Sequence, residues 1–330
     1  MQKVETNGLD LVAIGGGTGL STLLSGLKKY VGLQADGQSV KRLSAIVAVS
    51  DDGGSSGRLR DELQMPPPGD IRNCMVALSE DSHLLARLFQ HRFSGDGDLS
   101  GHNFGNLFLA ALSEVTGDFA EAVRLSSEIL ASKGHIFPAT VSDVRIAARL
   151  ADGSVVQGET NISKTGGRIV RLYLEPENCK PHPDAIAAIN NADLVTVGPG
   201  SLYTSLLPPL LVSGVVNALT ASSATKVFVC NLMTQPGETD GLTARRHLEI
   251  VREYAPGLDF DYVIVNNRPI SELQARLYTR DGAEQIGVHG SIDSESIEGA
   301  KVISTNLLDE SELVRHDPDR LARCVLELNS

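Results

Sequence analysis

A short apolar run that ends in a cluster of glycines constrains the fold of this chain more than any other feature. Residues 11–14 have the length and β-branched content of a buried strand, and Gly15, Gly17 and Gly19 follow at once. Leucines then recur at helical spacing from 20 to 27. A strand, a glycine turn and a helix in this order predict an α/β unit. Backbone N–H groups at the start of such a helix can approach a phosphate closely.

The glycine spacing differs from both of the best-known phosphate-binding motifs. It reads G-x-G-x-G, whereas the dinucleotide fingerprint places its third glycine where Leu20 stands. A Walker loop would need a lysine soon after Gly19, and none is there. A tight turn that binds no ligand is therefore the alternative, and further motifs have to decide.

Polar clusters follow three more predicted buried strands. The strand at 43–49 runs into Asp51, Asp52 and a glycine–serine loop, and the strand at 192–197 runs into a second glycine-rich turn, Gly198-Pro199-Gly200-Ser201. The strand at 226–230 leads to a polar segment from 231 to 239 that contains Asn231 and Thr234. Open α/β sheets bind ligands in a crevice outside the carboxyl ends of their strands. The spacing therefore predicts one ligand cleft shared by several loops.

The polar residues of the first half allow more than one role. An acid at the tip of the second strand suits a ribose hydroxyl, and the pair Asp51 and Asp52 could also hold Mg²⁺. The alternative is an Asp-Gly turn followed by a serine N-cap. Asp70 is predicted as the N-cap of a helix that begins with Arg72 and Asn73, where a cap beside a surface arginine is the plainer interpretation.

A second pair of candidates lies further along. His102 and Asn106 are predicted four residues apart on one face of a helix. There His102 could contact a phosphate or act as an acid or base near neutral pH. A capping histidine, or one satisfied in the core, is the alternative. Residues 133–177 are predicted as a small antiparallel β insertion, or sub-lobe, within a single domain that spans 1–330.

Composition excludes some partners. The chain of 330 residues has a formal net charge of −12, which disfavours a general nucleic-acid or anionic-membrane surface. Residues 1–10 lack the apolar core of a signal peptide, and two prolines interrupt the most apolar region, 206–219, so no membrane span is expected. Four cysteines are scattered without a C-x-x-C pair, which predicts reduced, mostly buried thiols in a cytoplasmic protein.

Taken in order, these loops resemble the bacterial gluconeogenesis-factor (YvcK) family, a relative of the CofD transferases that add 2-phospho-L-lactate to a deazaflavin precursor. The matching stretches are GGGTGLSTLLSGLK, SDDGGSSGRLR, PPPGDIRNCMVALS, GHNFGNLFLAAL, DLVTVGPGSLYTSLLPPLL and VCNLMTQPGETDGLTA, with RHD near the end. The resemblance implies a Rossmann-like, doubly wound and mostly parallel sheet with helices on both faces. It also implies a cytoplasmic protein that binds a nucleotide-linked ligand.

Carried over by position, the resemblance implies that the glycine turns meet the ligand's phosphates and that the C-terminal part contacts the nucleotide sugar. The implied ligand-binding residues are Gly16, Gly17, Thr18, Gly19, Asp51, Asp52, Ser55, Asn73, His102, Asn106, Gly198, Gly200, Ser201, Asn231, Thr234, Tyr278 and Arg315.

The resemblance implies two alternative functions, and the Rossmann-like start of the chain suggests a third. The first is a regulator that binds a UDP-sugar such as UDP-N-acetylglucosamine without turnover and links carbon metabolism to cell-wall morphogenesis and cell shape, with a homodimer and cell-wall synthesis proteins as its expected partners. The second is a CofD-like transferase that moves a 2-phospho-lactyl group from a nucleotide donor to a deazaflavin acceptor, with Mg²⁺ on Asp51 or Asp52. The third, an NAD-dependent oxidoreductase, lacks the regular fingerprint.

Overall fold

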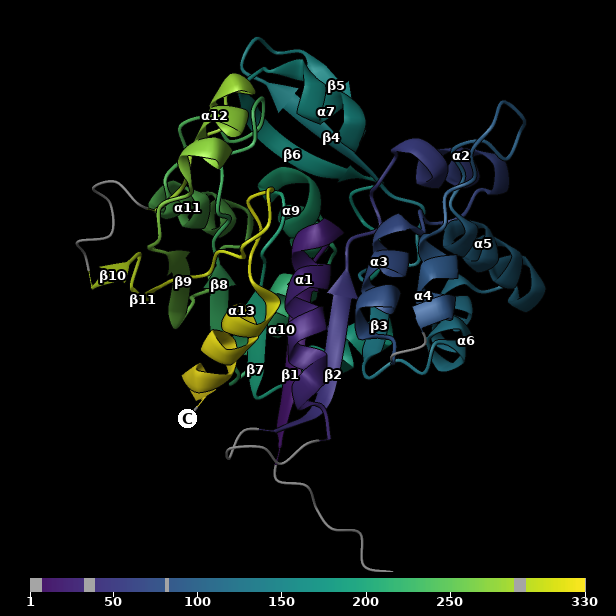
Figure 1. The fold of residues 1–330 in the computed structure, drawn as a ribbon, viewed down its shortest axis with the longest axis horizontal. Coiled ribbons are helices and arrows are strands. Elements are labelled where there is room, and N and C mark those ends of the chain that lie inside the picture. Colours follow the sequence, from purple (N-terminus) through teal and green to yellow (C-terminus); the bar gives the residue numbers. More distant parts are fainter. Residues whose placement is uncertain (1–7, 33–38, 81–82, 288–294, 330) are drawn as a thin grey trace, which may run out of the picture.

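The computed structural model describes residues 8–32, 39–80, 83–287 and 295–329. Most of residues 1–10, the segment noted above for lacking the apolar core of a signal peptide, lies outside this part. The described sheet has eight strands in the order β10-β11-β9-β8-β7-β1-β2-β3 (Figure 1). These strands are β1 (Leu9–Gly15), β2 (Val40–Val47), β3 (His135–Pro138), β7 (Leu194–Val197), β8 (Thr225–Val229), β9 (Tyr262–Asn266), β10 (Ser296–Ile297) and β11 (Ala300–Thr305).

The central strands are parallel, as their unbroken apolar runs predict. Leu11, Val12, Ala13 and Ile14 of β1 are each at most 2% exposed, because helices cover both faces of the sheet. In the register of the sheet, Ile14 lies between Ile46 of β2 and Val197 of β7. The three strands therefore end side by side, and the loops that follow them leave the sheet at the same edge.

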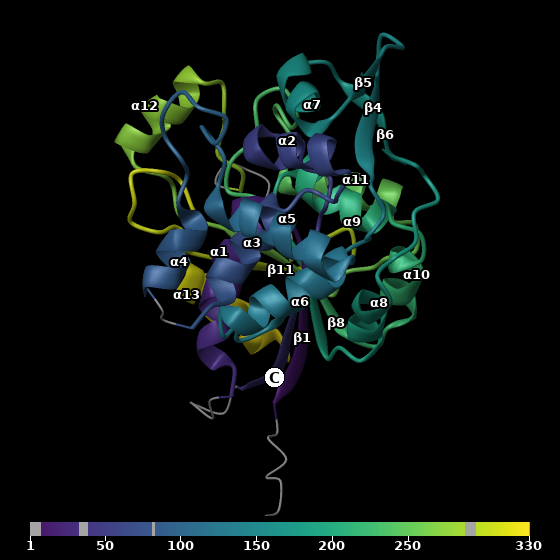
Figure 2. The ribbon, with the colours of Figure 1, turned by 90° about the vertical axis from the view of Figure 1, so that its right-hand side faces the viewer.

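Helices lie on both faces of the sheet, which confirms the doubly wound prediction. Figures 1 and 2 show α1, α3 and α13 on one face and α8 and α10 on the other. Helix α1 approaches α13 closely at Gly26, where a methyl group would lie 2.7 Å from the Pro318 carbonyl carbon. The helices are α1 (Gly17–Leu27), α2 (Gly54–Leu63), α3 (Gly69–Leu78), α4 (His83–Gln90), α5 (Phe104–Thr116), α6 (Phe119–Ile129), α7 (Glu159–Thr165), α8 (Pro183–Asn190), α9 (Leu207–Leu211), α10 (Val215–Ala221), α11 (Ala244–Tyr254), α12 (Glu272–Arg280) and α13 (Pro318–Leu326).

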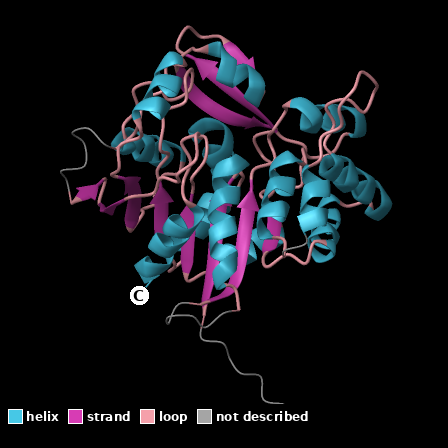
Figure 3. Cartoon of the chain, viewed as in Figure 1, coloured by secondary structure: helices cyan, strands magenta, loops and turns pink. Residues whose placement is uncertain are grey.

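A small antiparallel sheet forms a separate lobe above the main one (Figure 3). It consists of β4 (Arg145–Leu150), β5 (Val155–Gln157) and β6 (Ile169–Glu175) in the order β5-β4-β6, with α7 between β5 and β6. The insertion predicted at 133–177 was too long at its start. Strand β3 pairs in parallel with β2 and so belongs to the main sheet. The lobe itself begins at Arg145.

Two predicted helix positions are wrong. Asp70 is not an N-cap, because α3 begins one residue earlier with Pro68 as its N-cap, and the Asp70 carboxylate accepts the Gly17 backbone N–H instead. His102 does not share a helix face with Asn106, because α5 begins at Phe104 behind the cap Asn103. The loop before α5 and the first turn of α5 nevertheless bring His102 and Asn106 to α2.

The remaining local features concern the last helix, the cysteines and the membrane. Asp317 caps α13 and Pro318 occupies its first position, where the fixed φ of proline suits a helix start. All four cysteines are free and buried. Within the described ranges no single helix is long and apolar enough to cross a membrane. The segments Leu202–Leu211 and Val215–Ala221 reach that length and composition only together, with a bend of 79° between them.

Candidate functional site

The two glycine-rich turns touch each other. A methyl group on Gly19 would lie 2.7 Å from the Pro199 carbonyl carbon and 3.0 Å from the Gly200 backbone nitrogen, so only glycine lets the turns pack this closely. Gly17 has a φ of 63°, in the left-handed region that glycine adopts without strain. The turns after β1 and β7 thus form one continuous wall, because these strands are neighbours that end in register.

A cavity of about 450 Å³ lies over this wall. It brings together ten of the predicted site residues from five separate segments of the chain: Gly16, Gly17, Thr18, Gly19, Gly200, Ser201, Asn231, Thr234, Tyr278 and Arg315. Its volume is within the range of small-molecule sites. A larger groove of about 670 Å³ lies between α6, β3 and α8, and it contains none of the predicted residues. Gly198 lies outside the lining and closes the end of β7, packed against the Val229 carbonyl.

Several lining side chains hold backbone segments in place. The Asn231 side chain makes two hydrogen bonds to the backbone of Gly200. Its Oδ1 accepts the Gly200 N–H at 3.0 Å, and its Nδ2 donates to the Gly200 carbonyl oxygen at 2.7 Å. The Thr234 hydroxyl accepts the Glu284 N–H at 2.8 Å. The Tyr278 hydroxyl accepts the Val314 N–H at 3.1 Å, which fixes the segment that carries Arg315. These four hydrogen bonds tie the segments of the cavity wall to one another.

The C-terminal end of the cavity has a charged residue beside a neutral one. Arg315 is exposed and has no carboxylate within ion-pair distance in the part of the chain that the structure describes. His316, which sequence analysis did not single out, also lines the cavity and is 7% exposed. Burial lowers its pKa to about 4, so its imidazole is neutral at pH 7. Its position inside the motif RHD was the available signal.

The other predicted residues gather in a second group, around the end of β2. Ser55 Oγ lies 3.1 Å from His102 Nδ1, and Asn106 Nδ2 donates to Ser56 Oγ at 3.3 Å. The loop before α5 and the first turn of α2 therefore face each other. Asn73, on α3, accepts a hydrogen bond from Arg72 at 2.6 Å.

Asp70 joins the two groups. Its carboxylate accepts the Gly17 N–H and would lie 2.6 Å from a methyl group on Gly16. Burial, and then the nearby charge of Asp51, raise the pKa of Asp70 to about 7. This aspartate is therefore divided between its two protonation states near neutral pH, directly beneath the first glycine turn.

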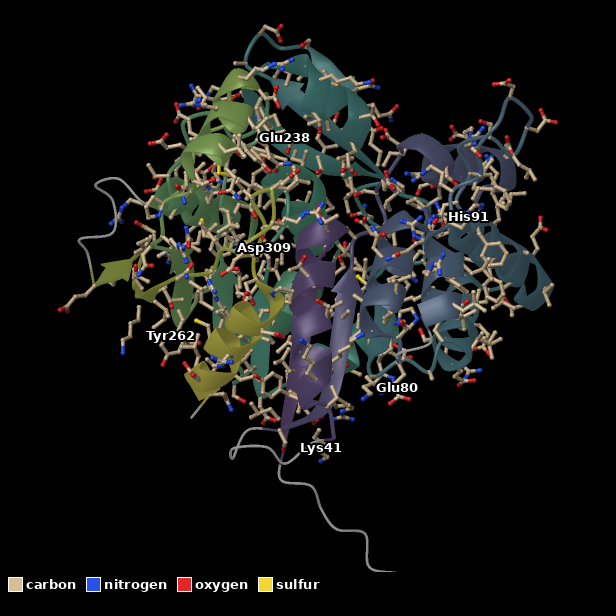
Figure 4. The ribbon with its side chains drawn as sticks, in the orientation of Figure 1. Lys41, Glu80, His91, Glu238, Tyr262 and Asp309 are labelled. Atoms are coloured by element: carbon tan, nitrogen blue, oxygen red, sulfur yellow. The ribbon has the colours of Figure 1, made fainter. Side chains whose placement is uncertain are left out.

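The lobe also reaches the site, although its sequence suggested no role. Thr160 of α7 donates to Asp52 Oδ1 from its backbone N–H at 2.9 Å and from its hydroxyl at 2.8 Å. Ser163 donates to Glu238 at 2.6 Å, and Ser201 of the second turn donates to the same carboxylate at 2.7 Å (Figure 4). Burial, followed by the charges of neighbouring carboxylates, raises the pKa of Glu159 to about 9.

The predicted Mg²⁺ ligands point in different directions. Asp51 Oδ1 accepts the Gly53 N–H at 2.8 Å and its Oδ2 lies against Gly69, whereas Asp52 turns to Thr160. In the described residues, no group of three or more histidine, cysteine, aspartate or glutamate side chains could hold a metal ion. The two carboxylates do not form a shared chelate as they stand, and a Mg²⁺ ion here stays a prediction.

A doubly wound sheet with a cavity over two adjoining glycine turns defines an α/β protein of the Rossmann-like class. The model of the 2-phospho-L-lactate transferase CofD family matches residues 11–308. The gluconeogenesis factor of Bacillus subtilis is 42% identical over 319 residues, covering 96% of this chain and 97% of that protein. The gluconeogenesis factor of Halalkalibacterium halodurans is 42% identical over 321 residues, covering 96% of each chain.

A solved structure agrees with these sequences. The crystal structure of a UPF0052 family member from Bacillus halodurans superposes with a TM-score of 0.89 at 43% identity, covering 96% of this chain and 98% of that one. The chain therefore belongs to the CofD family and, within it, to the gluconeogenesis factors.

Proposed function

We propose that this protein binds a nucleotide sugar, with UDP-N-acetylglucosamine as the representative ligand, in the cavity over the two glycine turns. The observation that carries the proposal is the direct contact between Gly19 and the 199–200 peptide, which joins both turns into one wall of a 450 Å³ cavity. Thr18 and Gly19 would face the diphosphate with their N–H groups, since α1 has no N-cap side chain and the Gly17 N–H already donates to Asp70. Arg315 would neutralise charge from the opposite end.

The proposal includes a regulatory role without turnover. The names of the relatives support a link to carbon metabolism. In this role the ligand reports the supply of cell-wall precursors in the cytoplasm, and the protein passes that signal to cell-wall synthesis proteins and so to cell shape. Lining side chains such as Asn231 and Thr234 are committed to backbone contacts, which suits binding more than chemistry.

Isothermal titration calorimetry with UDP-N-acetylglucosamine tests the proposal. We expect Arg315→Gln to weaken binding about tenfold, because one charge-assisted hydrogen bond is lost. The matched control is Arg323→Gln, an exposed arginine on α13 outside the cavity lining, which should bind as the unchanged protein does. The absence of both heat and a thermal shift at millimolar ligand would refute nucleotide-sugar binding. Chromatography of the incubated ligand checks for turnover.

The second candidate is a transferase of the CofD type. The match to the CofD family model and the carboxylates of Asp51 and Asp70 beside the first glycine turn favour it. Purified protein would be incubated with Mg²⁺, a deazaflavin acceptor and an activated phospho-lactyl donor. Product formation that Asp51→Asn abolishes would establish this activity. If no product forms while UDP-N-acetylglucosamine still binds, the regulatory function stands.

A further inference from the structure

Two arginines hold the loop before α5 from different sides. Arg58 of α2 donates to the Ser100 carbonyl oxygen at 2.7 Å, and Arg92, which follows the His91 labelled in Figure 4, donates to the Gly101 carbonyl oxygen at 2.7 Å. These carbonyls belong to adjacent residues, so the two guanidinium groups approach one short segment. Each guanidinium group uses one of its five N–H donors for this hydrogen bond, so most of its donors can still bind another acceptor.

A third arginine joins this pair. The stem of Arg72 lies beside the first turn of α5, where a methyl group on Gly105 would be 2.9 Å from its Cγ and Cδ atoms. Burial, and then the positive charge of Arg92, lower the pKa of Arg72, while two carboxylates of the adjoining site raise it more weakly. The guanidinium groups of Arg72 and Arg92 are therefore close enough to repel each other.

These three arginines do not pair with carboxylates. Arg124, Arg145 and Arg252 do form such ion pairs, whereas Arg58, Arg72 and Arg92 share with Arg315 the lack of one in the described part of the chain. Across the described ranges, no carboxylate oxygen lies within 4.0 Å of Arg58, Arg72 or Arg92. This holds in a chain with a net charge of −12, where acidic groups are in excess. An unbalanced positive cluster in an acidic protein is the electrostatic environment that favours a bound anion.

Neutral donors and a buried unpartnered atom surround the same place. Helix α2 begins at Gly54 behind Gly53, which has no side chain to cap the first N–H groups. The Ser55 and Ser56 hydroxyls follow in its first turn and are hydrogen-bonding neighbours of His102 and Asn106. Arg72 Nε is a buried donor that has no hydrogen-bond partner among the described residues. An oxyanion would give this N–H group the acceptor that it lacks.

We propose that Arg58, Arg72 and Arg92, with the first turns of α2 and α5, form a second subsite that binds an oxyanion of the phosphate or carboxylate type. None of the three arginines lines the 450 Å³ cavity, so the subsite adds to the proposed nucleotide-sugar site and does not require it. The anion comes from the far end of the same ligand or from a separate small molecule, and both offer the same chemistry to the guanidinium groups.

Line broadening of inorganic phosphate in ³¹P NMR tests this subsite on the full chain. We expect line broadening that persists in the presence of saturating UDP. The broadening should decrease as salt is added, because salt screens exposed charges. Arg92→Gln and Arg58→Gln should each weaken phosphate binding about five- to tenfold. Both side chains are exposed, so these variants should remain folded. Arg87→Gln, an exposed arginine on the neighbouring helix α4, is the matched control and should behave as the unchanged protein.

The outcomes separate the two sources and the two proposals. Phosphate that binds together with UDP but is displaced by UDP-N-acetylglucosamine assigns the subsite to the far end of that ligand. Phosphate that binds together with both assigns it to a separate anion. The inference is overturned if phosphate at about 20 mM, a concentration that should reveal even a weak site, causes no line broadening. It is also overturned if Arg87→Gln weakens phosphate binding as much as Arg92→Gln does. UDP-N-acetylglucosamine binding is measured independently, so its failure would leave this test intact.

Discussion

Replacing Gly19 by alanine tests whether the two glycine turns must touch. The new methyl group would lie 2.7 Å from the Pro199 carbonyl carbon, about 1 Å closer than ordinary carbon contacts. The Pro199 carbonyl group and the Gly200 nitrogen, which obstruct the methyl group, both belong to the backbone of the second turn. No side-chain rotation can therefore relieve the overlap. The turns would have to separate by roughly 1 Å, at a cost of about 1–3 kcal/mol in the free energy of unfolding.

Urea unfolding measures that cost, and a thermal scan should show a decrease of roughly 1.5–4 °C for a chain of this length. Because the separated turns no longer form one wall, UDP-N-acetylglucosamine should also bind more weakly. The control is Gly97→Ala, which has an ordinary φ and no atom within 4 Å of the added methyl group. If both variants unfold at the same urea concentration and bind alike, the inferred contact does not stabilise the site.

Three further predictions concern the same region. Asn231→Leu removes both hydrogen bonds to the Gly200 peptide and should lower the free energy of unfolding by about 2 kcal/mol, measured in urea. Asp70→Asn cannot ionise. Because the raised pKa of Asp70 makes the folded protein lose stability as pH rises from about 4 to about 7, the variant should show a flatter pH dependence of unfolding, and an unchanged slope would contradict this sign. Asp143→Asn leaves the fully buried Arg60 side chain without its carboxylate at 2.5 Å and should cost about 1–2 kcal/mol by thermal unfolding; a loss below about 0.3 kcal/mol would show that the pair contributes little.

Local chemistry made much of the fold predictable. Strand β1 is buried on both faces, and this burial appears in the sequence as an unbroken apolar run. Helix α1 is buried on one face, and this burial appears as leucines at helical spacing. Asp317 followed by Pro318 signals a helix start for reasons of backbone geometry alone. The predictions failed where packing shifted a boundary by a residue or two, as at Asp70, or reassigned a strand, as at β3.

The sequence by itself determined that polar loops follow buried parallel strands, and hence that a cleft lies at one edge of the sheet. It could not determine which loops share a wall. The ten predicted residues that line the cavity meet because β1 and β7 are neighbours in register, although the paired residues Leu11 and Leu194 are 183 positions apart along the chain. Only the tertiary structure brought Glu159, Thr160 and the arginines of α2 and α3 to this edge. Electrostatic and steric effects of this kind depend on distances in space, and those distances leave no period or spacing along the chain.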